Sequence, residues 1–129
     1  MKDFHREITI SRDPVWVPEK LHNASTGAVS HFLGVVRETE NGALIKGIDY
    51  EAYLPMADRQ FHRIATEAGQ EFGSHPLHLQ HRTGFVPASE ASIVIAVAMP
   101  HSKEAFDLCQ YYLRRIKTEV PIWKNVVFK

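Results

Sequence analysis

Apolar residues in the last third of the chain occur first in one continuous run and then at regular intervals, and each pattern predicts one element. Residues 93–98 are apolar without interruption, which is typical of a strand buried on both faces. A helix is then predicted to begin at Lys103 with Ser102 as its N-cap, and Pro121 should stop it, because a proline disfavours helical conformation in the preceding residue. Apolar residues three and four positions apart form the face that this helix should bury: Ala105, Phe106, Leu108, Cys109, Tyr112, Leu113 and Ile116.

A second helix is predicted between Pro55 and Gly73. Proline suits the first turn of a helix, and glycine suits the position just after its last turn. The spacing between them again marks one apolar stripe: Ala57, Phe61, Ile64, Ala65, Ala68 and Phe72.

Three strands are predicted in the first half of the chain, at residues 7–11, 27–38 and 44–53. The dipeptide Asn41-Gly42 lies between the last two and is a strong signal for a hairpin turn, so residues 44–53 should return antiparallel. Residues 18–23 are expected to form a short helix that begins at a proline.

Residues 77–82 alternate leucine with polar side chains, which predicts a strand with one face in water. Residues 84–90 are expected to form a loop. The order of strands, helix, strands and helix indicates the α+β class, with a mostly antiparallel sheet and helices packed on one side. A length of 129 residues predicts a single domain over residues 1–129.

Composition argues against some classes of function but identifies none. Fifteen basic and fifteen acidic residues give a formal net charge of zero, which argues against a general binder of nucleic acid or of membrane surfaces. No apolar run approaches the length of a membrane span. The single cysteine, Cys109, leaves no intramolecular disulfide and fits the reducing cytoplasm. It lies on an apolar helix face, where we expect an inert buried thiol.

Three histidines, His75, His78 and His81, invite a metal interpretation. On a strand His78 would face away from the other two, because side chains alternate between the faces. No CxxC or HExxH pattern accompanies them, so we expect no metal site.

Two lysines bracket the predicted helix stop: Lys117 in the last turn, and Lys124 beside Trp123. Taken alone, lysines near a helix C-terminus are usually solvated and satisfy the helix dipole. The stretch that holds them, IKTEVPIWK, nevertheless resembles the signature of the large, catalytic subunit of molybdopterin synthase, the MoaE family. The resemblance extends to three further stretches and covers residues 27–124: MPHSKEAF at 99–106, GVVRE at 34–38 and YEAY at 50–53.

The resemblance implies a fold, an activity and partners. The fold would be an α/β hammerhead with a small inserted β subdomain. The activity would be that of a sulfurtransferase enzyme in molybdenum cofactor biosynthesis, which makes the molybdopterin dithiolene from cyclic pyranopterin monophosphate. Sulfur would come from the C-terminal thiocarboxylate of a small ubiquitin-like subunit, in a heterotetramer built on a homodimer of the large subunit. No cofactor or metal is expected for this step.

The resemblance also assigns roles to individual residues. Lys117 would act at the thiocarboxylate as electrostatic stabiliser or acid–base, because positioned cations stabilise negative charge that develops on oxygen. Lys124, the second catalytic lysine, would hold the substrate phosphate together with Arg37. From the residues alone, Arg37 is equally an edge arginine in a surface ion pair with Glu38 or Glu40. The full set of implied substrate-binding residues is Val36, Arg37, His101, Ser102, Lys117, Lys124 and Asn125.

The pair His101-Ser102 lies where the second long helix begins. Backbone N–H groups at a helix start form an anion site; alternatively, Ser102 only caps the helix and His101 only packs. The family commonly has His-Arg here, so this chain lacks one cation. His101 and Lys117 would lie ~24 Å apart along one helix, at ~1.5 Å per residue. If both contact substrate, a second copy of the chain must supply His101 to the Lys117 pocket.

Two other interpretations stay open. One is a non-catalytic paralogue that only binds a ubiquitin-like partner, for which Ser102 is the hint. The other is an unrelated α+β domain.

Overall fold

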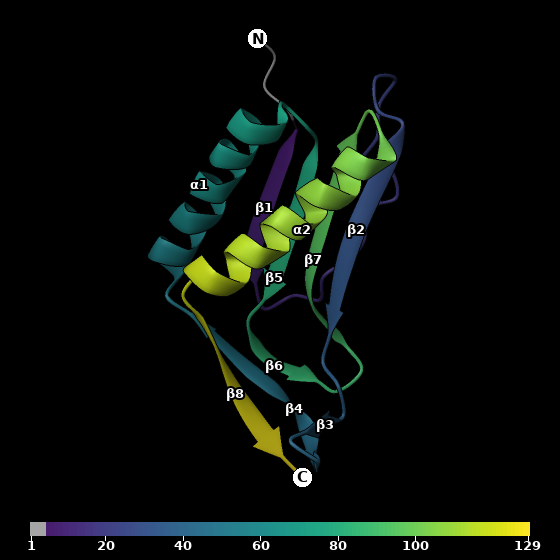
Figure 1. Ribbon diagram of the computed structural model, residues 1–129. Coiled ribbons are helices and arrows are strands. Elements are labelled where there is room, and N and C mark those ends of the chain that lie inside the picture. Colours follow the sequence, from purple (N-terminus) through teal and green to yellow (C-terminus); the bar gives the residue numbers. More distant parts are fainter. Residues whose placement is uncertain (1–4) are drawn as a thin grey trace.

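The computed structural model describes residues 5–129, and its larger sheet has four strands in the order β1-β5-β7-β2 (Figure 1). β1 runs parallel to β5, whereas the β5–β7 and β7–β2 pairs are antiparallel. The bounds are Arg6–Ser11 for β1, Ala28–Val35 for β2, Leu77–Arg82 for β5 and Ala91–Met99 for β7. β7 is buried almost throughout, as its continuous apolar run predicted.

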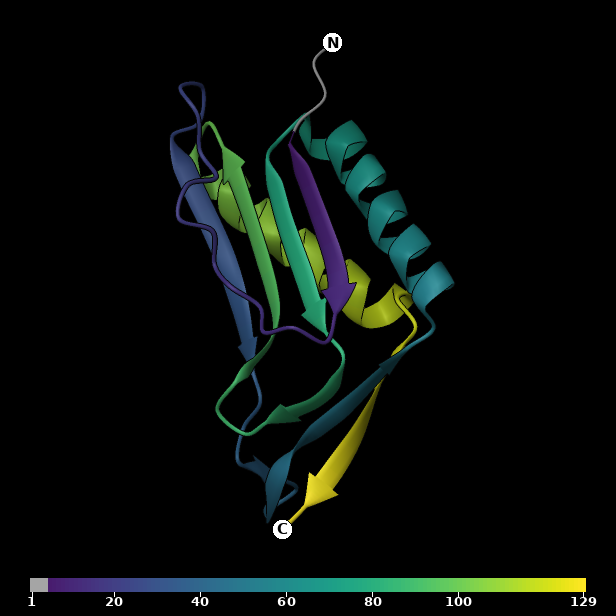
Figure 2. The ribbon, with the colours of Figure 1, turned by 180° about the vertical axis from the view of Figure 1, so that it is seen from behind.

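Both helices, α1 (Leu54–Phe72) and α2 (Ser102–Glu119), cover the same face of this sheet (Figure 1). Seen from behind, the opposite face is crossed by the segment between β1 and β2 (Figure 2). The predicted α+β class, with a mostly antiparallel sheet and helices on one side, is therefore confirmed. The main core lies between helices and sheet, and its fully buried side chains include Phe61, Leu79, Ile95, Leu108 and Tyr112.

A smaller sheet extends from one end of the larger one and matches the expected β subdomain (Figure 1). β4 is its central strand and pairs antiparallel with each of the others. The bounds are Thr39–Glu40 for β3, Ala43–Ala52 for β4, Gly84–Pro87 for β6 and Ile122–Phe128 for β8. It has a core of its own, made of Val36, Ile45, Ile48, Tyr50 and Val86.

The hairpin at Asn41-Gly42 is confirmed, but it joins shorter elements than expected. Both residues have positive φ, 51° and 81°, which favours this dipeptide at a tight turn. The turn connects β4 to the two-residue β3, and the strand expected over residues 27–38 ends at Val35. The long partner of β4 is β8, from the C-terminal end of the chain. Local turn chemistry identified the reversal, whereas the main pairing is set by distant residues.

Three expectations about connecting segments were wrong. Residues 18–23 form no helix, and their side chains are largely exposed, so no buried face stabilises one. Residues 84–90 contain β6, a strand of only four residues that ends at Pro87. The strand 77–82 has no wet face: β5 is buried on both sides, because the segment after β1 covers His78 and Gln80. There the Trp16 backbone N–H donates to Gln80 Oε1 at 2.9 Å, and the Trp16 ring packs on His78.

The start of α2 also differs from the expectation. The helix begins at Ser102, and its N-cap is His101, which makes no capping hydrogen bond through its side chain. The backbone at His101 is extended, and its carbonyl accepts the first helical hydrogen bond from Ala105 N–H at 3.1 Å. Phe106, expected on the buried face, is 67% exposed. Tyr111 of α2 is instead buried in the main core.

Candidate active site

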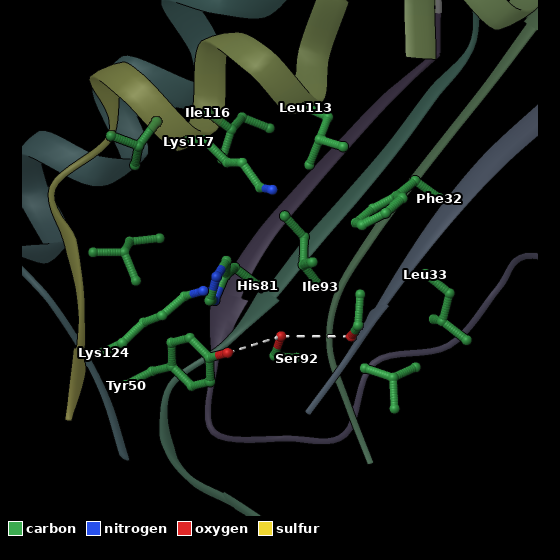
Figure 3. A pocket seen from close by; sticks show the side chains of 14 residues that line it. Phe32, Leu33, Tyr50, His81, Ser92, Ile93, Leu113, Ile116, Lys117 and Lys124 are labelled. Atoms are coloured by element: carbon green, nitrogen blue, oxygen red, sulfur yellow. Dashed lines mark hydrogen bonds between the residues drawn. The ribbon is translucent and has the colours of Figure 1, made fainter. Parts of the chain in front are cut away.

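A cavity of about 640 Å³ opens where the larger sheet, the end of α2 and the smaller sheet meet (Figure 3). Its size suits a small-molecule substrate. One wall is apolar and is formed by Phe32, Ile93, Leu113 and Ile116. Because apolar walls exclude water, charged groups that enter the cavity interact more strongly there than in bulk solvent.

Lys117 and Lys124 both line this cavity and come from different elements (Figure 3). Lys117 is in the last turn of α2, which ends at Glu119. The chain reverses at Pro121 and returns as β8, where Lys124 is paired with Tyr50 of β4. The proline break therefore brings two lysines seven positions apart onto one cavity. Both lysines are exposed to solvent in the single chain.

The far side of the cavity carries a short chain of hydroxyl groups (Figure 3). The Tyr50 hydroxyl donates to Ser92 Oγ at 3.2 Å, and the Ser92 hydroxyl donates to the Gly34 carbonyl at 3.5 Å. Tyr50 is 5% exposed and Ser92 is 6% exposed. These bonds tie β4, β7 and β2 together beside the lysines, so the wall opposite Lys117 is held in place.

His81, at the end of β5, contributes the remaining polar side chain of the cavity. Its ring packs edge-on against Tyr50, with centroids 5.2 Å apart. His81 Nδ1 lies 2.9 Å from the Arg82 carbonyl oxygen. Burial lowers the pKa of His81 to about 4; the bond to the Arg82 carbonyl opposes this shift and the charge of Lys124 adds to it. The ring is therefore neutral near pH 7.

Three expected site residues are neighbours in sequence of residues that line the cavity, but do not line it themselves: Val36, Arg37 and Asn125. Arg37 follows β2 by two residues, with a side chain 79% exposed and 3.9 Å from Glu40. Both backbone groups of Val36 are already used: its N–H donates to the Glu90 carbonyl at 2.9 Å, and its carbonyl accepts from Ser89 at 2.7 Å. The Asn125 amide donates to Glu51 at 2.7 Å. The substrate contacts expected of these three residues stay predictions.

His101 and Ser102 are exposed at the opposite end of α2 from Lys117. The single chain therefore brings Lys117 and Lys124 together and leaves His101 apart from them. The roles of His101 and Ser102 stay predictions too.

The other two histidines are used inside the fold. His75 Nε2 lies 2.6 Å from the Tyr112 hydroxyl, and its Nδ1 lies 2.8 Å from the Gly73 carbonyl. His78 lies 2.9 Å from Gln80 on the sheet face away from the cavity, opposite His81 as alternation predicted. Within residues 5–129, no three His, Cys, Asp or Glu side chains lie close enough to hold a metal ion. Cys109 is buried, which raises its pKa and disfavours the reactive thiolate.

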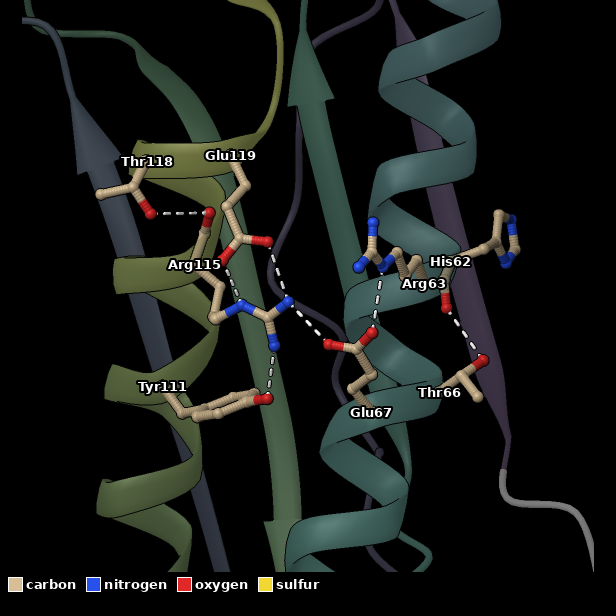
Figure 4. A network of polar contacts seen from close by, with 8 residues as sticks. All are labelled: His62, Arg63, Thr66, Glu67, Tyr111, Arg115, Thr118 and Glu119. Atoms are coloured by element: carbon tan, nitrogen blue, oxygen red, sulfur yellow. Dashed lines mark hydrogen bonds and ion pairs between the residues drawn. The ribbon is translucent and has the colours of Figure 1, made fainter.

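An ion-pair network ties the last turns of α2 to α1 (Figure 4). Arg115 donates to Glu119 within α2, to Glu67 of α1 at 2.7 Å, and to the Tyr111 hydroxyl at 2.5 Å. Arg63 donates to the second oxygen of Glu67 at 3.0 Å. Arg115 holds the pKa of both carboxyl groups below their usual range. The network fixes the end of α2 that carries Lys117.

Comparison with known proteins shows the family to which the chain belongs. The sequence model of the MoaE protein family matches residues 10–119. The chain belongs to the MoaE protein family. It is 37% identical over 111 residues to the molybdopterin synthase catalytic subunit of Bacillus subtilis, covering 86% of this chain and 71% of that protein. It is also 37% identical over 103 residues to the human protein of the same name, covering 80% of this chain and 55% of the human one.

Solved structures agree with this assignment. The crystal structure of molybdopterin synthase from Staphylococcus aureus aligns over 100% of this chain and 93% of its own, with 36% identity and a TM-score of 0.86. The fold implied by the sequence resemblance is therefore confirmed. In this member of the MoaE family, the motif IKTEVPIWK supplies both lysines of the cavity.

Sequence reasoning missed three polar side chains of the cavity. Tyr50 lies in the quoted stretch YEAY but received no role, and Ser92 was not singled out. His81 was considered only as a metal ligand. One signal was available: alternation places His81 on the same face as Leu77 and Leu79, the face that the helices cover. A histidine on that face, at the end of a strand, marks a polar position at the edge of the core.

Proposed function

We propose that this chain is the catalytic subunit of molybdopterin synthase. It would transfer sulfur from the C-terminal thiocarboxylate of a small ubiquitin-like carrier to cyclic pyranopterin monophosphate, making the molybdopterin dithiolene. The observation that carries the proposal is the convergence of Lys117 and Lys124 on one cavity, from the stretch IKTEVPIWK that resembles the family signature. The catalytic subunits of Bacillus subtilis and human molybdopterin synthase are relatives at 37% identity.

The chemistry suits two cations beside an apolar wall. Attack by a thiocarboxylate and opening of a cyclic phosphate both build negative charge on oxygen, which positioned ammonium groups stabilise. Lys117, on α2, acts at the thiocarboxylate end, where it stabilises charge or passes a proton. Lys124 holds the phosphate together with Arg37, which follows the end of β2. Entry of the carrier tail covers the cavity mouth and strips water from both lysines.

A second copy of the chain supplies His101, and the position of β2 favours this arrangement. β2 is an edge strand of the larger sheet, and its outward face carries Val29, Leu33 and Val35, which are 41–49% exposed. The free edge of β2 is suited to pairing with a strand of another chain, which would also cover this apolar face. Its end, at Val35, lines the cavity, and its start is paired with Met99, two residues before His101.

Two-fold pairing of β2 with its own copy would bring these ends together. In an antiparallel pair, the start of one strand lies beside the end of the other. Eight residues of β2 span ~26 Å at ~3.3 Å each, close to the ~24 Å from His101 to Lys117 along α2. His101 and Ser102 of one protomer would thus approach the lysine cavity of the other. The assembly is a homodimer with one small subunit at each cavity, a heterotetramer.

No helix within the described residues is long and apolar enough to cross a membrane. The proposed reaction belongs in the cytoplasm, and it uses no cofactor and no nucleic acid.

Turnover separates this function from its alternatives. The chain is mixed with a thiocarboxylated small partner and the pterin precursor, and dithiolene formation is followed with time. Dithiolene product supports the enzyme. Binding of the partner without product would instead indicate a docking subunit. The absence of both binding and product would contradict the proposal altogether. The matched control is a partner with an ordinary C-terminal carboxylate, which should bind and yield no product.

A further inference from the structure

His81 differs from the two lysines because it belongs to the rigid part of the molecule. It is 7% exposed and lies on β5, between β1 and β7, where its backbone pairs with Ile10 and Ile93. Its ring nevertheless lines the cavity, and the Lys124 side chain points toward it (Figure 3). A ring held in this way keeps one orientation whether the cavity is empty or filled.

The hydrogen-bonding state of this ring follows from its backbone partner. A carbonyl oxygen can only accept, so Nδ1 carries a hydrogen and donates it to the Arg82 carbonyl at 2.9 Å. In a neutral ring the other nitrogen, Nε2, then has a lone pair and no hydrogen. Among the residues that the structure describes, Nε2 has no hydrogen-bond partner. The ring that lines the cavity beside two cations therefore has an unused acceptor at Nε2.

An anion in this cavity changes the balance at His81. The charged groups around the ring are Lys124 from β8, Lys117 from α2, and Arg82 on its own strand, which pairs with Glu90 at 2.8 Å. The remaining neighbours, Tyr50 on β4 and Ile93 and Ser92 on β7, are uncharged near pH 7. The positive charge of Lys124 opposes protonation of the ring in the empty cavity. A bound anion offsets that charge and offers an acceptor to Nε2–H, and both effects favour the protonated ring.

We propose that His81 is a third, proton-coupled ligand of the anion held by Lys124. In the empty cavity the ring is neutral; when an anionic phosphate group binds, Nε2 takes up one proton from solvent, and the protonated ring donates a hydrogen bond to a phosphate oxygen. This inference rests on the proposed function only in identifying that anion as the phosphate of the substrate. It adds a substrate-contacting residue on β5 to the pair of lysines.

Proton uptake makes anion affinity depend on pH. Because binding and protonation are linked, affinity should rise by up to about tenfold per unit as pH falls between the pKa values of the occupied and empty states. Sulfate is the probe, since it carries two charges throughout this range and does not titrate itself. The pKa of His81 is followed by NMR of the ring, with and without sulfate, from about pH 8 down to about pH 3, so that the titration of the empty state is included.

The expected result is a rise in the pKa of His81 of about one unit or more on addition of sulfate. His81→Gln, which keeps a polar side chain but cannot titrate, should bind sulfate with an affinity independent of pH. Lys124→Ala should remove most of the sulfate effect. His78, buried on the same strand but facing away from the cavity, is the matched control, and its titration should not respond to sulfate.

Several results would overturn the inference. One is a His81 titration that sulfate leaves unchanged, including the case in which sulfate does not bind at all. Another is a response to a peptide ending in Gly-Gly carboxylate but not to sulfate, which would assign His81 to the carrier tail. Turnover is measured separately on the unmodified chain, so the two proposals can fail independently. Turnover without proton coupling removes only the role of His81; coupling without turnover supports that role and contradicts the enzyme.

Discussion

The two ends of α2 contrast sharply, although both carry residues that the family resemblance assigns to substrate. At the C-terminal end, Lys117 opens onto a cavity that also contains Lys124 and His81. At the N-terminal end, His101 and Ser102 are exposed, and Phe106 beside them is 67% exposed. One end is thus a formed half-site, and the other is a surface. On the proposed function, the single chain holds its substrate at the cavity end, and the other end would contribute when a second chain covers it.

The largest expected effect is on turnover at the cavity end. Lys117→Ala should reduce the rate of dithiolene formation by ~100-fold or more, because a cation that stabilises developing charge is lost. Folding should be unaffected, since Lys117 is exposed and lies off the buried face of α2. The rate of product formation and thermal unfolding are the two measurements.

Lys103→Ala is the matched control at the other end of the helix. Lys103 is also exposed, and it pairs with Asp107 at 2.7 Å. Its loss should leave turnover near normal. Near-normal turnover in Lys117→Ala would remove the functional contrast between the two ends.

Acid should lower the free energy of unfolding through the buried His81 at the cavity end, and not through the exposed His101 at the other end of α2. The native pKa of His81 is lowered to about 4 by burial, below its value of 6.5 in the unfolded chain. The unfolded chain therefore binds more protons between these values. The contribution of His81 to the free energy of unfolding is fully present above pH ~6.5, and it falls by at most ~3 kcal/mol as pH drops toward ~4. Burial lowers the pKa of His75 in the same direction.

Urea unfolding at several pH values measures this effect. His81→Gln should flatten the dependence of the unfolding free energy on pH, whereas His101→Gln at the exposed end should leave it unchanged. Equal pH dependence in the two variants would show that His81 does not titrate as its burial requires.

Lys124 lines the cavity whereas Arg37 lies outside it, although both side chains are exposed. Lys124→Ala and Arg37→Ala should each weaken precursor binding by about tenfold and reduce its dependence on salt, because fewer charges are screened. The Arg37 side chain is 79% exposed, so its contribution should disappear first as salt is raised. Calorimetric titration at several salt concentrations checks this. Unchanged affinity and salt dependence in both variants would show that neither residue holds the anion.

The smallest expected effect is on stability, at the network that joins α1 to the last turns of α2 (Figure 4). Arg115→Ala should lower the free energy of unfolding by about 1 kcal/mol, since partly exposed ion pairs contribute little individually. Because this network orients the turn that carries Lys117, turnover should also fall. Expressed as a free energy, that loss should exceed the loss of stability. Arg59→Ala, on the exposed face of α1, is the control. A loss of stability without any loss of turnover would separate the network from the site.

Local patterns predicted the elements that are buried in a regular way. The apolar run of β7 and the spacing along α1 and α2 were sufficient, because burial against a sheet imposes those periods. β6 and β8 escaped prediction since they are stabilised by pairing with β4, over 30 residues away in sequence. The buried state of His78 and Gln80 escaped for the same reason: a distant segment at Trp16 covers them.

The candidate site was predictable in part for a related reason. Lys117 and Lys124 share one continuous motif, so the sequence placed them together. His81, Tyr50 and Ser92 reach the same cavity from three different strands, and no local spacing reports that meeting. The proposed contribution of His101 through a second chain rests on the family resemblance together with the length of α2.

Mixed dimers test most directly the claim that the two ends of α2 serve one composite site. Lys117→Ala and His101→Ala are each inactive on this account, and the two variants are unfolded together and refolded at equal amounts. Half of the dimers are then mixed, and each of these has one cavity with both residues intact, so activity should return to about a quarter of the unmodified level. No recovery in dimers shown to be mixed, or full activity of a strictly monomeric chain with its small partner, would contradict the composite site.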